Sequence, residues 1–308
     1  MARRLFSLVL AGALIAAAPV QARQRELSEV TIKTEKVADG VWMLVGAGGN
    51  IGVSAGPDGA LLIDGQYPSL TGKIKAAVAA LGDQPIRFLL DTHWHGDHVS
   101  GNENFGKAGA LIIAHDNVRA RMSAEQFSKL FDRTVPPAPK AALPVVTFND
   151  TMTFHLNGET IVAFHAPPGH TDGDAIVRFT RAGVVHLGDC FFNGTYPVID
   201  VSAGGSIGGM IAVADLVLGQ IGEGTKLIPG HGPLGDKASF QAFRDMLVTA
   251  RDRIRPLVEA GKTEDEVVTA KPTAELDAKW GRGFMTPEMF VRTVCSDLVR
   301  AVKAEEAK

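Results

Sequence analysis

Short apolar runs alternate with polar breaks along most of this chain, and their spacing separates expected strands from expected helices. The runs VTIKTEKV, VWMLVG, NIGVSAG and ALLIDG, between positions 30 and 65, are β-branched or apolar and end near Gly, Asn or Asp, which predicts four strands. The next stretch, SLTGKIKAAVAAL, places Ile74, Ala77, Val78 and Leu81 at helical spacing before Gly82, which predicts an amphipathic helix. IRFLL and ALIIAH predict two further strands, and DNVRARM predicts a helix.

The second half of the chain repeats this order of strands followed by helices. Asp116 is the expected cap of the helix DNVRARM, and the prolines of RTVPPAPKAALP predict a surface loop after it. VTF, MTFHL, TIVAFHA, AIVRFT and VVHLGD then predict five strands in close succession. SIGGMIAVADLVLGQI predicts a helix, TKLIP a strand, KASFQAFRDMLVTARDRIRPLVEAG a long helix and PEMFVRTVCSDLVRAVKAEEA a closing helix. This order favours an α/β fold with two sheets packed face to face and helices outside.

The first 22 residues have the pattern of a secretory signal peptide. Arg3 and Arg4 precede the apolar run LFSLVLAGALIAAAPV, which ends in the small-residue pattern VQA at positions 20–22. An N-terminal membrane anchor is the alternative, which the short run and its cleavage-like end disfavour. We therefore expect a signal peptide over 1–22 and a single exported domain with C-terminal helices over 23–308, periplasmic if the host has an outer membrane. No later segment resembles a membrane span, so no stable membrane association is expected after cleavage.

Charge and cysteine content narrow the class of partner. Loss of Arg3 and Arg4 with the signal peptide would change the formal charge from −3 to −5. A mildly acidic surface without a basic stripe argues against nucleic-acid binding. Cys190 and Cys295 are the only cysteines and neither lies in a paired-cysteine motif, so a disulfide is disfavoured. The expected partner is a small-molecule substrate, and no pattern indicates an oligomeric state.

Histidines are concentrated in the stretch LLDTHWHGDHVSGNENF, where three histidines and two aspartates fall within eight residues. His93, His95, Asp97 and His98 form H-x-H-x-D-H directly after a predicted strand, so we expect them on a loop. In a turn, His93 and His95 could share one metal while Asp97 and His98 face a second. Imidazole and carboxylate suit zinc, and also iron or manganese. A solvated polar loop is the alternative, which this dense spacing disfavours.

Three further candidate ligands follow apolar runs later in the chain. His170 lies in PPGHTDGD, Asp189 in HLGDCF and His231 in LIPGHGPL. Their Gly and Pro neighbours let the backbone bring a side chain up to a buried ion. His165, five residues before His170, is a candidate to orient a ligand. The remaining histidines are expected to be structural: His115, His155 and His186.

The motifs H-x-H-x-D-H, G-H-T, G-D and G-H-G, in this order between about Val41 and Leu234, resemble those of the metallo-β-lactamase superfamily. The resemblance implies a four-layer αββα sandwich with the site at one edge of the sheets. It also implies the ligands of two metal ions. The first ion would be held by His93, His95 and His170, the second by Asp97, His98 and His231, and Asp189 would bridge the two.

The resemblance further implies a metal-dependent hydrolase with two divalent ions, zinc being expected and iron or manganese being alternatives. Two such ions can lower the pKa of a shared water to about 7 and so provide hydroxide that attacks an acyl carbon. Asp97 would have a carboxylate oxygen to spare, which makes it the candidate catalytic residue that orients the hydroxide and passes on its proton. Cys190 would point away from Asp189 along a strand, so we expect it to be packed rather than metal-bound.

The residues around Asp189 indicate which class of substrate is expected. In the best-known zinc β-lactamases a cysteine ligand matches Asp189 and a lysine follows three residues later, where this chain has Phe192. A bridging aspartate is instead typical of thioester, lactone and phosphodiester hydrolases of the superfamily. The segment FFNGTYPVIDVSAGGSIGGM should pass over the metals, where Phe192 and Tyr196 could line an apolar pocket and Asn193 could bond a substrate oxygen. The interpretation is an exported dinuclear hydrolase of a small ester, lactone, thioester or amide.

Three alternatives stay open at this point. β-Lactam hydrolysis fits an exported enzyme of this fold, whereas export would remove a glyoxalase-type thioesterase from its glutathione thioester. A mononuclear iron dioxygenase acting on sulfur substrates is disfavoured because those relatives keep only three ligands. A metal-binding protein without catalysis is disfavoured by the presence of Asp97. Metal analysis separates these classes, because two ions per chain favour hydrolysis and one iron favours oxidation.

Overall fold

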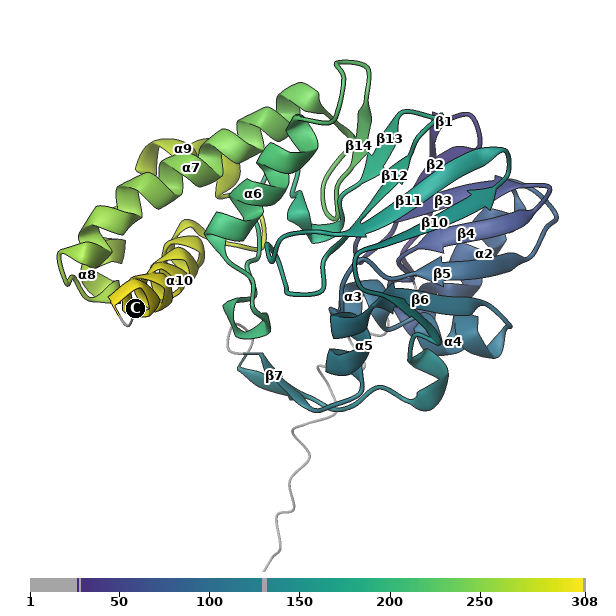
Figure 1. The fold of residues 1–308 in the computed structure, drawn as a ribbon, viewed down its shortest axis with the longest axis horizontal. Coiled ribbons are helices and arrows are strands. Elements are labelled where there is room, and N and C mark those ends of the chain that lie inside the picture. Colours follow the sequence, from purple (N-terminus) through teal and green to yellow (C-terminus); the bar gives the residue numbers. More distant parts are fainter. Residues whose placement is uncertain (1–26, 28, 129–131, 307–308) are drawn as a thin grey trace, which may run out of the picture.

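The computed structural model describes residues 27, 29–128 and 132–306, and in this part of the chain the elements form four layers (Figure 1). A seven-stranded sheet and a six-stranded sheet face each other across an apolar core. Helices cover the outer face of each sheet. This is the αββα sandwich expected from the sequence.

The first sheet has the strand order β1-β2-β3-β4-β5-β6-β9. Its strands are β1 (Lys33–Ala38), β2 (Val41–Val45), β3 (Ile51–Gly56), β4 (Gly59–Ile63), β5 (Ile86–Leu90), β6 (Leu111–His115) and β9 (Val146–Phe148). The first four strands pair antiparallel, and β4, β5, β6 and β9 are parallel. Along β4, Leu61 and Ile63 face the second sheet, whereas Leu62 packs with the outer helices α2 (Thr71–Ala79) and α4 (Asn102–Lys107).

The second sheet has the order β10-β11-β12-β13-β14-β15, with β13 and β14 parallel. Its strands are β10 (Thr151–Leu156), β11 (Glu159–His165), β12 (Ala175–Phe179), β13 (Val184–His186), β14 (Lys226–Ile228) and β15 (Gly235–Asp236). Val184 and Ile228 face the first sheet. Val185 and Leu227 point the other way, into the core under α6 (Ile207–Leu218) and α7 (Lys237–Glu259).

Three helices after α7 form a C-terminal extension, defined here as residues 264–306. They are α8 (Glu264–Thr269), α9 (Ala274–Trp280) and α10 (Pro287–Glu306), and they lie on the α6/α7 side of the molecule in Figure 1. Only α10 was expected from the sequence. Helix α8 begins with a capping box between Thr263 and Glu266, a local signal in the stretch TEDE. Trp280, Phe290 and Val294 bury the extension in the same apolar core as α6 and α7.

The remaining elements are short. They are α3 (Gly96–Val99), α5 (Asp116–Met122), the hairpin strands β7 (Gln126–Ser128) and β8 (Arg133–Val135), and the 3-10 turns η1 (Pro68–Leu70), η2 (Lys140–Ala142), η3 (Gly188–Cys190) and η4 (Val201–Ala203). The expectation that Asp116 caps α5 was wrong, because the cap is His115, whose Nδ1 accepts the N–H of Asn117. The expected loop over 133–144 begins with β8 and contains η2.

The expected signal peptide over 1–22 lies outside the described residues. Within the described residues, no helix combines the length and the apolar character that a membrane crossing requires.

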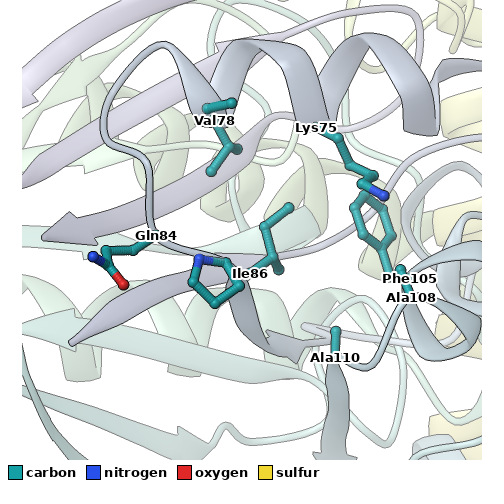
Figure 2. A pocket seen from close by; sticks show the side chains of 9 residues that line it. Lys75, Val78, Gln84, Ile86, Phe105, Ala108 and Ala110 are labelled. Atoms are coloured by element: carbon teal, nitrogen blue, oxygen red, sulfur yellow. The ribbon is translucent and has the colours of Figure 1, made fainter. Parts of the chain in front are cut away.

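A shallow apolar cavity of about 220 Å³ lies where α2 meets β5 and α4 (Figure 2). Val78, Ile86 and Phe105 line it, with Lys75 at its side. None of the candidate ligands contributes to its walls, so this cavity belongs to the packing of helix on sheet.

Candidate metal centre

Four separate segments, each of which follows a strand, bring the motif residues together at one edge of the sandwich. The expectation of a loop was wrong for Asp97 and His98, which lie on a short helix. Strand β5 ends just before His93, and helix α3 starts at Gly96 and carries Asp97 and His98. Strand β13 leads into η3 with Asp189, and the neighbouring parallel strand β14 ends just before His231. Parallel strands end at a common edge, and that is why residues distant in the sequence meet here.

Among the described residues, three groups of candidate ligands have donor atoms within 4.8 Å of one another, and one of them, His93, His98 and Asp189, takes a histidine from each of the other two. Of these other two groups, one is His93, His95 and His170, and the second is Asp97, His98 and His231. These two groups coincide with the two ligand sets that the family resemblance implied.

Asp189 lies between the two groups and turns one carboxylate oxygen toward each. Its Oδ2 is 3.9 Å from Nε2 of His93 and 3.5 Å from Nε2 of His170. Its Oδ1 is 3.1 Å from Nε2 of His98 and 3.4 Å from Nε2 of His231. This is the arrangement that a carboxylate bridging two cations requires.

Unpaired buried atoms provide a test of whether these residues fit metal ions. Nε2 of His93, Nε2 of His98 and Oδ1 of Asp189 are buried and make no hydrogen bond with the described residues, although the last two atoms lie 3.1 Å apart. A buried polar atom without a partner costs about 1–3 kcal/mol. Divalent ions at the two groups would satisfy all three atoms, so the donor set fits a pair of metals.

The second ring nitrogen of three histidines is held by a neighbour, and this orients the ring. Nδ1 of His93 lies 3.0 Å from Oγ1 of Thr92, and Nδ1 of His98 lies 2.8 Å from Oδ2 of Asp64. Nδ1 of His170 is 2.8 Å from the carbonyl oxygen of Val198. Each contact leaves Nε2 to face the centre, and a second ring nitrogen held in this way is usual for metal-binding histidines.

His95 is oriented the other way round. Its Nε2 lies 2.9 Å from Oδ2 of Asp200, so its Nδ1 faces the centre, 2.8 Å from Nε2 of His170. Sequence reasoning missed both Asp200 and Asp64. Asp64 ends the apolar run of β4 in ALLIDG much as Asp189 follows β13, and that position was a usable signal. Asp200 has no comparable signal, because it lies in an irregular segment.

Burial and neighbouring charges shift the pKa values of the cluster. Burial lowers the pKa of His93 well below its ordinary value. Burial alone would lower the pKa of His231, but the carboxylates of Asp189 and Asp97 outweigh it and raise that pKa to about 9. Burial would raise the pKa of Asp189, yet the surrounding histidines, His231 and His98 foremost, hold it well below its usual range. The carboxylates are therefore anionic at neutral pH, which favours cations.

The loop of residues 46–50 packs directly against the second ligand group. The N–H of Gly49 donates to the carbonyl oxygen of Asp97 at 3.1 Å. A Cβ on Gly49 would lie 2.1 Å from Cε1 of His98, and a Cβ on Gly48 would lie 2.3 Å from the same carbonyl oxygen of Asp97. Only glycine fits at these two positions without displacing the ligands.

The three expected substrate-contacting residues have different surroundings. Phe192 stacks on His231 with ring centroids 5.0 Å apart, so it lies beside the centre. Asn193 uses its side-chain amide to donate to the carbonyl oxygen of Pro233, which ties it to the loop that carries His231. The expectation that Tyr196 lines a substrate pocket was wrong, because this residue is 1% exposed and its hydroxyl donates to Asp277.

Cys190 and His165 have no contact with the candidate ligand atoms. Cys190 belongs to η3 rather than a strand, and its thiol donates to Oδ2 of Asp174 at 3.3 Å. Both cysteines are free and buried. His165 stacks on His115 at 3.8 Å and its Nε2 contacts the carbonyl oxygen of Asp172, so it does not orient a ligand.

Comparisons with known proteins agree with this geometry. A family model described as the metallo-beta-lactamase superfamily matches residues 44–243. A beta-lactamase-like protein 2 homolog from Caenorhabditis elegans is 22% identical over 245 residues, covering 77% of this chain and 75% of that protein. The hydroxyacylglutathione hydrolase of Rhodospirillum rubrum is 29% identical over 127 residues, covering 41% of each.

Solved structures share the fold. The metallo-beta-lactamase FIM-1 from Pseudomonas aeruginosa, in a mono-zinc form, matches with a TM-score of 0.58 at 19% identity. The match covers 72% of this chain and 97% of that one. At this identity the likeness concerns the fold alone.

Proposed function

The chain belongs to the metallo-β-lactamase superfamily of metal-dependent hydrolases, and we propose that it is an exported enzyme that uses two divalent ions to hydrolyse a small ester, lactone, thioester or amide. Zinc is the proposed metal, with iron or manganese as alternatives, because imidazole and carboxylate donors suit all three. Export is proposed from the N-terminal sequence, where a basic start and a short apolar run precede the pattern VQA.

The observation that carries the proposal is the position of Asp189 between two complete ligand groups. Each group supplies three donor atoms, and each faces a different oxygen of this one carboxylate. A protein that binds one metal ion does not need a second complete group of ligands, such as Asp97, His98 and His231. This completeness is also the argument against a mononuclear iron dioxygenase.

The metal ions and the residues of the centre would have different roles in catalysis. When bound, divalent ions supply Lewis acidity, which activates water at neutral pH and polarises the acyl group. Asp97 is partly exposed, and its Oδ2 faces Nε2 of His231 at 3.2 Å. Its other oxygen is available to orient the attacking water and to accept its proton. The charge of His98 keeps the pKa of Asp97 below its ordinary value despite burial, so this carboxylate is ionised at neutral pH.

Two observations bear on the substrate. The relative named hydroxyacylglutathione hydrolase supports thioester chemistry, although export would separate this chain from a cytoplasmic thioester. Phe192, whose ring lies against His231, provides an apolar wall at the position where the best-known zinc β-lactamases have a lysine. An apolar wall favours substrates without a carboxylate at this point. β-Lactam hydrolysis is therefore the second candidate, supported by the fold of the solved relatives.

The experiment is metal analysis of the mature protein together with assays on lactones, aryl esters, thioesters and β-lactams. We expect two ions per chain, and Asp189→Ala to reduce occupancy of both sites because its two oxygens face both groups. His95→Ala should remove much of the metal and the activity. One ion per parent chain, or full occupancy in Asp189→Ala, would contradict the proposal.

Cys190→Ala is the matched control, because this residue is adjacent to Asp189 but bonds to Asp174. It should keep both metals and lose at most about 1 kcal/mol of packing energy. If Cys190→Ala lost the second metal while Asp189→Ala kept it, the centre would be thiolate-ligated, and β-lactams would become the first candidate substrates.

A further inference from the structure

One irregular segment contacts three of the candidate ligands, which come from three different loops. We define it as the support segment, residues 192–206, between η3 and α6. Its contacts with His231, His95 and His170 involve ring stacking, a carboxylate and a backbone carbonyl.

The first contact is with His231. The ring of Phe192 stacks on the imidazole with centroids 5.0 Å apart and planes 20° apart. The N–H of Asn193 donates to the carbonyl oxygen of His231 at 2.9 Å. These two contacts fix both the backbone and the ring plane of this ligand.

The other two contacts fix ring tautomers. Oδ2 of Asp200 holds Nε2 of His95 at 2.9 Å, and the carbonyl oxygen of Val198 holds Nδ1 of His170 at 2.8 Å. The N–H of Asp200 also donates to the carbonyl oxygen of His170 at 2.9 Å. A shift of this segment would therefore turn two rings of the first group together.

The support segment itself is held by the C-terminal extension at its far end. Arg300 on α10 donates to the carbonyl oxygens of Val201 at 3.1 Å and Gly205 at 2.9 Å. The same guanidinium pairs with Asp297 at 2.9 Å, and Asp297, which is 3% exposed, accepts the N–H of Ile207. This ion pair on α10, formed by the buried Asp297 and the exposed Arg300, thus fixes the segment just beyond Asp200.

A second attachment holds the middle of the support segment. The N–H of Tyr196 donates to the carbonyl oxygen of Trp280 at 2.8 Å, and its hydroxyl donates to Asp277 at 2.7 Å. Its ring stacks on Phe290 of α10 with centroids 4.2 Å apart. All these partners belong to α9 and α10, beyond residue 243 where the family match ends.

We infer that the C-terminal extension is a positioning element of the metal centre, in which Arg300 and the Tyr196–Asp277 pair orient His95, His170 and His231 through the support segment. The inference rests on the metal binding proposed above. It concerns affinity for the ions rather than the identity of the substrate, so it can be tested without knowing the reaction.

The experiment compares Arg300→Ala with Arg292→Ala in the full mature chain. Both arginines lie on α10 and form ion pairs, but those of Arg292 go to Asp265 and Glu288, away from the support segment. Zinc affinity is measured by competition with a chromophoric chelator, and the visible spectrum is recorded after cobalt substitution. We expect Arg300→Ala to lose about tenfold in zinc affinity and to change the cobalt spectrum. Arg292→Ala should resemble the parent in both.

Tyr196→Phe is the second variant, because it deletes one hydroxyl and keeps the ring stacked on Phe290. We expect a smaller loss of zinc affinity in the same direction, and it supplies the test if Arg300→Ala does not fold. Parent-like affinity and cobalt spectra in the folded variants would overturn the inference while leaving the proposed function intact. A parent that binds no metal would overturn both.

Discussion

His95 differs from the other oriented histidines in presenting Nδ1 to the centre, and the cause is a single carboxylate. Oδ2 of Asp200 lies 2.9 Å from Nε2 of His95 and selects the tautomer in which Nε2 carries the proton. Because burial is outweighed by its bonds with His95 and Ser202, the pKa of Asp200 lies below its ordinary value, and the side chain is an anion at neutral pH. An anionic acceptor also increases the basicity of the ligand nitrogen.

Asp200→Ala should lower zinc affinity by about 10–100-fold, because His95 would lose the partner that fixes its ring. Asp200→Asn keeps an oxygen acceptor and should lose less. Chelator competition measures both, with Asp215→Ala as the control, since Asp215 pairs with Arg244 on the helical surface. Equal affinities in the parent and in Asp200→Ala would show that this contact does not orient the ligand.

His186 is a buried histidine outside the ligand set, and its hydrogen bonds require the neutral imidazole. Its Nε2 donates to the carbonyl oxygen of Asn50 at 3.1 Å, and its Nδ1 accepts the N–H of Gly188 at 3.1 Å. Protonation would break the second bond. Burial lowers its pKa from 6.5 to about 4.

The sign of the pH effect follows from this depressed pKa. Between pH 6.5 and 4 the unfolded chain binds a proton that the folded chain does not. The contribution of His186 is thus complete above pH 6.5 and is lost as the pH falls through 4, a change on the order of 3 kcal/mol. Urea unfolding of the parent and His186→Gln, both with chelator present, should show a steeper acid loss in the parent. Parallel pH profiles would contradict this assignment.

At the scale of residues, the sequence indicated the seven candidate ligands that the structure brings together, but not the groups that orient them. His93 to His98 are close in sequence, and each of Asp189 and His231 follows an apolar run with glycine beside it. Asp200 belongs to an irregular stretch 105 residues beyond His95, and its role depends on a contact that only the tertiary structure creates. Tyr196 was misassigned for the same reason, because an aromatic residue near a site has the same sequence pattern whether it faces the site or the core.

At the scale of elements, the loop between β2 and β3 packs so closely against the ring of His98 that only glycine fits at position 49. Gly49→Ala would bring a Cβ within 2.1 Å of the His98 ring, so the loop or the ligand must move. We expect a loss of about 1–3 kcal/mol in stability and reduced occupancy of the second metal position. Thermal unfolding and metal analysis measure the two effects.

Gly72→Ala provides the matched comparison, because nothing lies within 4 Å of a Cβ at that position on helix α2. Its stability should equal or slightly exceed that of the parent, since alanine is the better helix former. If Gly49→Ala also behaved like the parent, the packing of this loop on His98 would be looser than described.

Elements with a clear period were predicted well, whereas pairing partners and short elements were not. The strand VTF was expected among the strands of the second half, yet β9 pairs with β6 and closes the first sheet. A three-residue run has no period that could reveal its partner. Helix α9 and the hairpin β7–β8 were also missed, because they are short and stabilised mainly by tertiary contacts.

For the whole molecule, the N-terminal pattern predicts that the mature protein begins near Arg23 and is found outside the cytoplasm. The physical reason is that the apolar run at 5–20 is long enough for a signal peptide but short for a stable membrane helix. Intact-mass measurement of protein from the exported fraction gives the mature N-terminus. A chain that retained Met1 in the membrane fraction would favour the anchor.

Each sheet of the sandwich is made from one continuous stretch of chain, residues 33–148 for the first and 151–236 for the second. Each ligand group nevertheless takes two residues from the first stretch and one from the second, and Asp189 joins from the second. If the protein were divided into two polypeptides between Asn149 and Asp150, both metal positions would be split between the pieces. The apolar core between the sheets would favour their reassembly, and zinc would add to it, so the yield of reassembled protein should rise with zinc concentration.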